Sequence, residues 1–254
     1  MVKTIKNKRL TLLMRAISVI LFVFANSIQA VPISELFEGS SFFVYDKEFY
    51  DWTLLTESRV WREDGNDNPV DTGVDYSEID VQVLSDNPLN PGLRYVASSN
   101  SGLDVSAPDG SSATEILDVA FAFKVRTLDG SERIKDNTLE LLEFSGSSIF
   151  TLNITETLGG SQGGVGAKEV YARDIDDGLE SVLFDMEVFT PQSFLFVTTT
   201  IRMAAASQGP DRGSAVLESF EQRFSQVPEP ATLALMGLGL AGIGYQRRRQ
   251  IKMA

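Results

Sequence analysis

Residues 118–126, with the sequence DVAFAFKVR, are the stretch that decides the fold of this chain. Apolar side chains stand at every second position, and small or charged side chains stand between them. Successive side chains of a β-strand point to opposite faces of the sheet, so this pattern is typical of a strand with one buried face. It predicts that Phe121 and Phe123 point into a core.

The same kind of pattern recurs on both sides of this stretch. Residues 79–83 alternate strictly, and turn-forming residues at 86–92 separate them from a return strand at 93–97. Residues 182–188 also alternate, and residues 194–203 form a long run that is rich in β-branched side chains. Each of these segments is therefore predicted to be a strand.

Two further predictions concern pairing and element type. Residues 138–144 and 149–155 are predicted to form a pair of strands joined through 145–147. The apolar positions of residues 215–224 fit a period of two and also a helical stripe. We prefer a strand there, with a helix as the alternative.

The remaining segments carry loop signals. Residues 98–112 and 159–166 are rich in small and turn-forming residues, and residues 64–69 break any regular element. About ten short strands without a convincing helix predict an all-β fold: a single antiparallel β-sandwich, jelly-roll-like, over residues 31–226. The sequence of this body shows no internal repeat, and no linker divides it, so a single domain is expected.

The composition excludes several classes of function. The full chain has 22 basic and 35 acidic residues, and residues 31–227 keep 13 of the basic and 34 of the acidic ones. A body with a net charge of −21 repels nucleic acid, so no nucleic-acid partner is expected. Cysteine and histidine are absent, which excludes disulfides, Ser–His and Cys–His catalysis, and histidine-ligated metals.

The first 30 residues have the three-part layout of a secretory signal peptide. A basic segment is followed by an apolar run over residues 16–24 and a short stretch that ends at Ala30. We expect signal peptidase to cleave after Ala30. Cleavage after Ser27 and an uncleaved N-terminal anchor are the alternatives, because Ile28 is larger than the residue preferred at that position.

The last segment, residues 227–254, also has three parts. It opens with Val227, Pro228, Glu229 and Pro230, continues with an apolar, glycine-rich run over residues 233–245, and ends with Arg247, Arg248 and Arg249. The prolines exclude a helix at the opening, and the glycines are compatible with a transmembrane helix after it. Because arginines remain on the cytoplasmic side, the body is expected on the far side of the membrane.

This order of parts resembles the PEP-CTERM sorting signal of Gram-negative bacteria. The resemblance implies an integral-membrane exosortase as a partner, cleavage near Pro-Glu-Pro, and passage from an inner-membrane intermediate to the cell surface or extracellular matrix. It also implies a setting of exopolysaccharide and biofilm, so extracellular polysaccharide is a candidate partner. The resemblance covers only the tail. It indicates where the protein is sorted and does not indicate an activity.

One acidic loop is a candidate calcium site. Asp174, Asp176, Asp177 and Glu180 surround Gly178. Calcium takes six to eight oxygen ligands, several of which such a loop can supply. The loop lacks the spacing of an EF-hand, and a solvated acidic turn is the alternative. No other cofactor is expected.

Aromatic side chains suggest a site for sugar rings. Trp52 and Trp61 lie close together in the sequence and are candidates for stacking on carbohydrate, with burial in the core as the alternative. We therefore expect an exported structural or adhesive protein associated with exopolysaccharide, and not an enzyme. The alternatives are a calcium-stabilised carbohydrate-binding module and a carbohydrate-active enzyme that uses carboxylates, such as Glu115 with Asp118 or Glu140 with Glu143.

Overall fold

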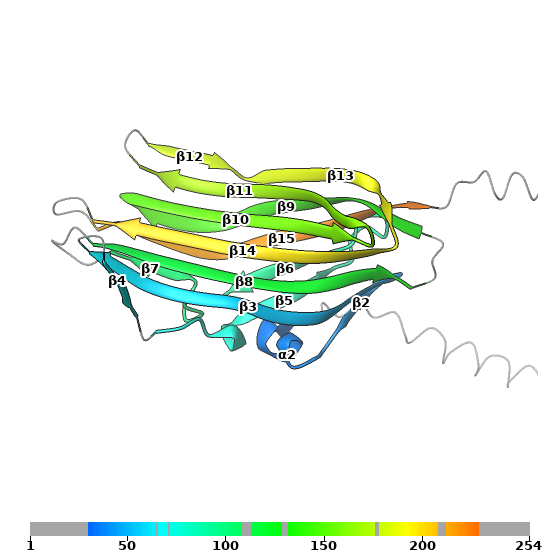
Figure 1. Cartoon of the computed structure of the whole chain (residues 1–254), viewed down its shortest axis with the longest axis horizontal. Helices are drawn as coiled ribbons and strands as arrows, with labels where there is room; N and C mark the ends of the chain where they lie inside the picture. Colours follow the sequence, from blue (N-terminus) through cyan, green and yellow to red (C-terminus); the bar gives the residue numbers. More distant parts are fainter. Residues whose placement is uncertain are drawn as a thin grey trace, which may run out of the picture.

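The computed structural model describes residues 30–63, 66–70, 72–107, 113–128, 132–175, 178–207 and 212–228. In these residues two antiparallel sheets pack face to face as a β-sandwich (Figure 1). The predicted antiparallel all-β class is confirmed. The described strands outnumber the eight of a jelly roll.

The seven-stranded sheet contains, in spatial order, β1 (Ala30–Pro32), β5 (Ile79–Leu84), β6 (Gly92–Ala97), β15 (Ser214–Pro228), β9 (Glu132–Ser147) and β13 (Phe184–Gln192), with β7 (Asp104–Ser106) also paired to β15. The eight-stranded sheet contains β12 (Leu179–Val182), β11 (Gly163–Asp174), β10 (Ile149–Gly160), β14 (Phe194–Ala206), β8 (Thr114–Thr127), β3 (Lys47–Glu63) and β2 (Phe42–Val44), with β4 (Asn66–Pro69) paired to β3. The short helices are α2 (Ile33–Phe37) and η1 (Tyr76–Glu78).

Aromatic side chains from both sheets fill the middle of the sandwich. Phe121 and Phe123 of β8 are buried, as predicted. Trp52 of β3 stacks on Phe123 with ring centroids 4.4 Å apart, and Tyr95 of β6 stacks on Phe220 of β15 at the same separation. An edge contact between Trp52 and Tyr95, with centroids 6.5 Å apart, joins the two stacks across the core.

A bulge in β3 explains why Trp52 points inward. Tyr50 pairs with Lys124 and Thr53 pairs with Ala122, so Asp51 and Trp52 together stand opposite one residue of β8. Asp51 has a positive φ of 57°, which marks the bulged position. Bulges re-aim a side chain relative to its neighbours, and here the bulge directs the indole onto Phe123.

The predicted pair of strands around residues 145–147 is wrong. β9 pairs with β15 and β13 in one sheet, whereas β10 pairs with β11 and β14 in the other. The chain crosses between the sheets at Ser148, whose φ is 55°. A Cβ added to Gly146 would lie 2.5 Å from Phe150, so the glycine leaves room for Phe150 to enter the core directly after the crossing.

Three predicted loops contain strands, and one ambiguous segment is resolved. Residues 66–69 form β4, residues 104–106 form β7, and β10 and β11 run through most of 159–166 as a hairpin. These departures have one cause: backbone pairing with a neighbouring strand overrides weak local propensity. The preference for a strand at 215–224 is confirmed, because this segment lies within β15.

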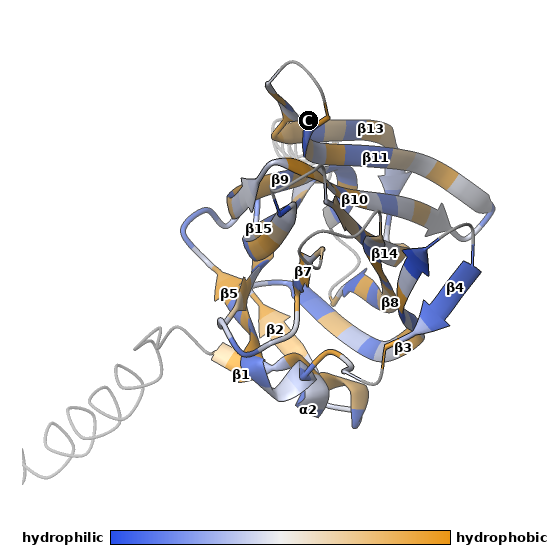
Figure 2. Ribbon diagram, turned by 90° about the vertical axis from the view of Figure 1, so that its left-hand side faces the viewer, coloured by the Kyte–Doolittle hydropathy of each residue, from blue (hydrophilic) through white to orange (hydrophobic). Residues whose placement is uncertain are grey.

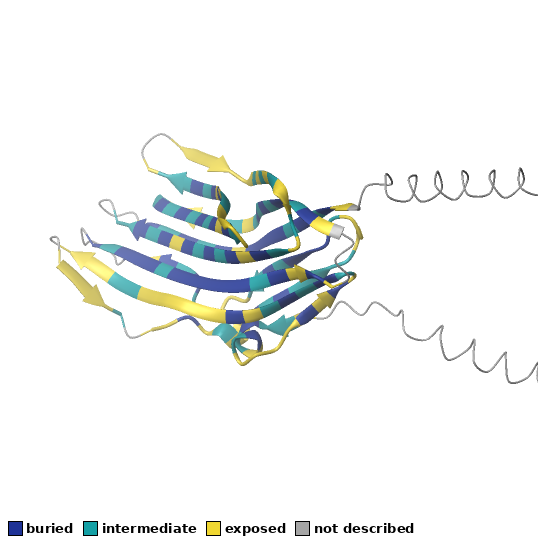
Figure 3. Ribbon diagram, turned by 45° about the vertical axis from the view of Figure 1, so that its right-hand side comes forward, coloured by how far each residue is buried: buried dark blue, intermediate teal, exposed yellow. Residues whose placement is uncertain are grey.

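The edge strands β12 and β13, at one side of the sandwich, are largely exposed (Figure 3). All four residues of β12 are exposed, and Phe184, Met186 and Val188 of β13 point to solvent. Asp185 points the other way and accepts a hydrogen bond from the backbone N–H of Glu169 on β11, at 3.0 Å. β13 therefore contacts both sheets at one side of the sandwich while its apolar face stays open.

The predicted targeting segments lie almost wholly outside the described residues, which begin at Ala30 and end at Pro228. Within the described ranges, neither helix has the length and hydrophobicity needed to cross a bilayer. The described sandwich begins with β1 at Ala30 and ends with β15 at Pro228, and the predicted division of the chain at residues 31 and 226 stays a prediction.

The two tryptophans give a direct test of this core. We expect Trp52→Ala to lower the free energy of unfolding by about 3–5 kcal/mol, because it removes a large buried ring and leaves a cavity. Trp61→Ala is the matched control: its residue is 43% exposed, and we expect a change below about 1 kcal/mol. Urea unfolding followed by circular dichroism measures both; equal losses would contradict the assignment of Trp52 to the core.

Candidate ligand-binding surface

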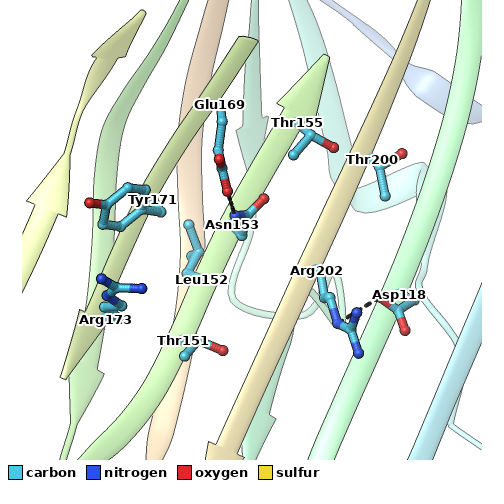
Figure 4. A pocket seen from close by; sticks show the side chains of 10 residues that line it. All are labelled: Asp118, Thr151, Leu152, Asn153, Thr155, Glu169, Tyr171, Arg173, Thr200 and Arg202. Atoms are coloured by element: carbon cyan, nitrogen blue, oxygen red, sulfur yellow. Dashed lines mark hydrogen bonds and ion pairs between the residues drawn. The ribbon is translucent and has the colours of Figure 1, made fainter. Parts of the chain in front are cut away.

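The outer face of the eight-stranded sheet carries a hollow of about 570 Å³ (Figure 4). It lies over the adjacent strands β8, β14, β10 and β11. We call it the outer-face hollow. The residues that line it are Asp118, Thr151, Leu152, Asn153, Thr155, Glu169, Tyr171, Arg173, Thr200 and Arg202.

The register of the strands aligns these side chains in rows. Tyr171, Asn153, Arg202 and Asp118 are successive partners across four strands. Directly opposite residues share one face of a sheet, so the four side chains form a continuous polar row. Glu169, Thr155 and Thr200 form the next row.

The residues between these positions explain why the rows face outward. Leu152, Ile154, Val170 and Ile201 alternate with the polar residues, and all four are buried in the core. Figure 2 shows the alternation as bands of hydropathy along the strands. The sequence thus places apolar atoms inside and hydrogen-bonding groups outside without any break in the strands.

Ion pairs and hydrogen bonds hold the polar groups of the hollow. Arg202 Nε lies 3.4 Å from Asp118 Oδ1, and Asn153 Nδ2 donates to Glu169 Oε1 (Figure 4). The guanidinium of Arg173 lies over the Tyr171 ring, 5.0 Å from its centroid. Opposite charges are therefore matched locally, and the surface offers both donors and acceptors.

Glu180 of β12 orders the β11 side of the hollow. Arg173 Nη2 donates to Glu180 Oε2 at 2.7 Å, and the Tyr171 hydroxyl donates to Oε1 at 3.1 Å. The hydrogen bonds from Arg173 and then Tyr171 lower the pKa of the Glu180 carboxyl below its usual range. The bond to Glu180 raises the pKa of the Tyr171 hydroxyl. Tyr171 and Arg173 are thus fixed by one carboxylate.

Neither predicted tryptophan lies in this hollow. Trp52 is 4% exposed and stacked inside the core, so its predicted role in carbohydrate stacking is wrong. Its burial follows from the bulge at Asp51. Trp61 is exposed, but it pairs with Glu115, whereas Asp118 pairs with Ser58. Residues three positions apart in a regular strand point to opposite faces of the sheet. Trp61 therefore points away from the hollow.

The strand register also shows how the carboxylate pairs proposed for a carbohydrate-active enzyme are placed. Glu115 is buried and accepts from Arg59 at 3.1 Å, while Asp118 stands in the outer-face hollow. The two carboxylates project from opposite faces of β8 and cannot flank one substrate. Glu140 and Glu143 of β9 belong to the other sheet, and a bulge between them places both opposite residues on one face of β15, Glu221 and Ser219, so the register does not separate this pair.

The predicted calcium loop is only partly within the described residues. Asp176 and Asp177 lie outside them, Asp174 ends β11, and Glu180 is engaged by Arg173. In the described part of the chain no group of three or more acidic side chains is placed to hold a metal ion. A calcium site here stays a prediction.

The residues of the hollow were not predicted from the sequence. Their signal was present in residues 151–155, where Thr151, Asn153 and Thr155 alternate with Leu152 and Ile154. Such a strand has one polar face, but the pattern does not show which strands lie beside it. The row from Tyr171 to Asp118 depends on that neighbourhood.

The sorting residues meet the sandwich at the end of β15. Val227 and Pro228 are paired with Arg133 and Glu132 of β9, whereas Glu229, Pro230, Arg247, Arg248 and Arg249 lie outside the described residues. A family model described as the PEP-CTERM protein-sorting motif matches residues 226–249. The chain carries a PEP-CTERM sorting motif. This motif implies export and sorting by an exosortase, a membrane enzyme, to the cell surface or extracellular space.

Comparison with other proteins adds no relative for the body. No curated protein sequence matches the chain. The enzymatically active domain of bacteriophage CBA120 tailspike protein 4 is 15% identical, with a TM-score of 0.23; the match covers 69% of this chain and 19% of that one.

Two further solved structures are similarly distant. A family 29 carbohydrate-binding module complexed with mannohexaose is 10% identical with a TM-score of 0.16, covering 66% of this chain and 91% of the module. The GH31 alpha-xylosidase of Xanthomonas citri is 8% identical with a TM-score of 0.16, covering 74% and 27%. Scores this low do not indicate a shared fold.

Removal of divalent cations tests the calcium prediction. Because Glu180 is bound by Arg173, we expect excess EDTA to change the melting temperature by less than about 1 °C, as for a protein without a bound ion. Differential scanning calorimetry with EDTA and with added calcium measures this. A melting temperature that rises with calcium concentration would instead support the acidic loop as a calcium site.

Proposed function

We propose that the sandwich is a non-enzymatic module that binds extracellular polysaccharide through the outer-face hollow, and that the PEP-CTERM tail delivers it to the cell surface or matrix. The single observation that carries this proposal is the polar row formed by Tyr171, Asn153, Arg202 and Asp118. The row crosses four strands on one open face, a shape that suits an extended chain of sugar units.

The chemistry of the hollow matches that of a polysaccharide. Sugars present many hydroxyl groups, which both donate and accept hydrogen bonds. The hollow supplies amide, hydroxyl, carboxylate and guanidinium groups, and Tyr171 supplies an aromatic ring. The acidic body repels anionic polymers, so a neutral or cationic polysaccharide is the preferred ligand.

The carboxylates of the hollow are occupied, which favours binding over turnover. Asp118 is paired with Arg202 and Glu169 accepts from Asn153. A glycosidase needs one free acid and one free base across the sugar ring. Neither carboxylate of this hollow is placed as such a free group.

The ends of the sandwich suit presentation from a membrane. β15 reaches its last paired residue, Pro228, only two positions after the sorting motif begins at residue 226. Ala30, the first residue of β1, pairs with Gln82 close to the end of β5. The last residue of β5, Leu84, pairs with Gly92, and Gly92 pairs with Arg223 near the end of β15. Ala30 and Pro228 therefore lie towards the same end of the sheet. We propose that signal peptidase and the exosortase act on segments that leave the domain at this same end.

Ligand binding is tested by substitution in the row. We expect Asn153→Ala and Tyr171→Ala each to weaken polysaccharide binding about tenfold or more, because each removes a contact worth roughly 1.5 kcal/mol. Affinity electrophoresis against extracellular polysaccharide from the producing cells measures the change.

Trp61→Ala is the matched control for this experiment, since it removes an exposed aromatic ring from the opposite face of the sheet. Equal binding by all three variants and the unaltered protein would place the ligand elsewhere. Release of reducing sugar during the assay would instead favour the enzyme alternative.

Sorting is tested at the tail. We expect replacement of Glu229 and Pro230 by alanine, or of Arg247, Arg248 and Arg249 by glutamine, to leave most of the protein in the inner-membrane fraction at its unprocessed mass. Cell fractionation with mass spectrometry measures location and processing together. Arg62→Gln, an exposed arginine on the body, is the control; normal delivery of the tail variants would contradict the sorting role.

A further inference from the structure

A cluster of polar side chains is enclosed between the two sheets. Lys168 of β11, Glu156 of β10 and Asn137 of β9 have exposures of 3%, 0% and 0%. Buried charges of this kind are rare because their desolvation costs several kcal/mol per ion. The outer-face hollow does not use them, since they lie on the inner faces of their strands.

The strand register brings the three groups together. Glu156 and Lys168 are direct partners on neighbouring strands of the eight-stranded sheet. Asn137 belongs to the seven-stranded sheet, so its contact with Lys168 crosses the core. The three groups meet although 31 residues separate Asn137 from Lys168 in the sequence.

Each group is held in a definite orientation. Lys168 Nζ lies 2.8 Å from Glu156 Oε1 and also donates to Oδ1 of Asn137. The amide nitrogen of Asn137 donates to the backbone oxygen of Arg223 at 3.0 Å, which turns the carbonyl towards the lysine. The other carboxylate oxygen, Glu156 Oε2, is buried and has no hydrogen-bond partner among the described residues.

An ion pair alone leaves part of this arrangement unexplained. A buried pair offsets its desolvation only when every remaining lone pair is satisfied, and Glu156 Oε2 has no hydrogen-bond partner among the described residues. The Asn137 amide accepts from the ammonium, so its carbonyl is held against the amine of Lys168. The combination of a nucleophilic amine, a carboxamide and an adjacent carboxyl in a dry core has a chemical use.

We propose that Lys168 and Asn137 become joined by an intramolecular amide bond, which forms without a cofactor and is promoted by Glu156. The bond links β11 of one sheet to β9 of the other. It is independent of what the outer-face hollow binds.

The reaction balances without any further reactant. The Lys168 ammonium transfers one proton to Glu156, leaving a neutral amine with two protons and a neutral carboxylic acid. Nζ attacks Cγ of Asn137 and forms the new bond. One of the two remaining Nζ protons moves through Glu156 to Nδ2, the Cγ–Nδ2 bond breaks, and Nδ2 leaves as ammonia. The products are a secondary amide, a protonated Glu156 and one ammonia molecule.

The surroundings favour each step. Burial raises the pKa of the Glu156 carboxyl above its usual range, although Lys168 and a hydrogen bond from Gln222 oppose the shift, so the proton-bearing form is accessible. Fixed contact between amine and carbonyl replaces a bimolecular encounter. The reaction also removes the buried charges of Lys168 and Glu156 together, which relieves the desolvation that the ion pair suffers.

Peptide mapping of the unaltered chain tests the proposal, whatever processing its ends have undergone. A protease that cleaves after glutamate separates residues 133–140 from residues 157–169. We expect these two segments to appear as one branched peptide that is lighter by one ammonia than their sum. Fragmentation must place the junction at Asn137 and Lys168, which distinguishes the bond from loss of ammonia within asparagine. Two separate peptides of full mass from folded protein would overturn the proposal.

Variants assign the roles. Lys168→Met removes the nucleophile, and Glu156→Gln keeps the size of the side chain but removes the proton carrier, so we expect neither to yield the branched peptide. Lys124→Met, which replaces a lysine paired with Asp51 at the surface, is the matched control and must retain it. Formation of the bond in folded Glu156→Gln at the normal rate would refute the role of Glu156. We expect a melting temperature lower by roughly 10 °C in the unlinked variants, because the cross-link constrains the unfolded chain.

Discussion

The contact between the two inner faces of the sandwich is the constraint on which the rest of this structure depends. Neither sheet can bury its apolar face alone, and the aromatic stacks of Trp52 with Phe123 and Tyr95 with Phe220 meet at the middle of the interface. The chain has no cysteine, so disulfides do not assist this contact. The strands that cover the core must therefore present apolar side chains inward in the correct register.

The same constraint determines what the outer face can do. In a strand with one buried face, every second residue is free of packing demands. On β10 and β14 these free positions hold Thr151, Asn153, Thr155, Thr200 and Arg202. Because the core fixes the register of the strands, it also fixes the order of these groups across the sheet. The arrangement of the outer-face hollow thus derives from residues on the opposite, buried face of the same strands.

Much of the fold was predictable from residues 118–126 and the segments that share their alternation. Strand existence depends on local periodicity, so β5, β6, β8, β14 and β15 were found. Which strands pair depends on long-range packing. At the crossing between the sheets, a serine with a positive φ gives no sign in the sequence that the chain changes sheet. The bulge at Asp51 similarly decides between the two roles that the sequence left open for Trp52, because one extra residue reverses the face of a side chain and directs the indole into the core.

The candidate sites were less predictable than the fold, for the same reason. The motif at residues 226–249 is contiguous, so the sequence was sufficient to find it. The polar row combines four strands, and the buried cluster combines Asn137, Glu156 and Lys168 from three. In the sequence these three residues look like ordinary polar positions. Only the closure of the two sheets shows that Lys168 is enclosed with a carboxyl and an amide.

The position of β15 makes closure of the seven-stranded sheet a late event. β15 is the last of the described strands in the sequence, yet it lies inside the seven-stranded sheet, between β6 and β9. That sheet cannot close until residues 214–228 have arrived, and these residues directly adjoin the sorting motif. Pairing between distant segments is slow, because the entropy of closing a long loop is lost before the stabilising contacts form. The seven-stranded sheet, and with it the dry core, is therefore completed only once residues 214–228 are in place.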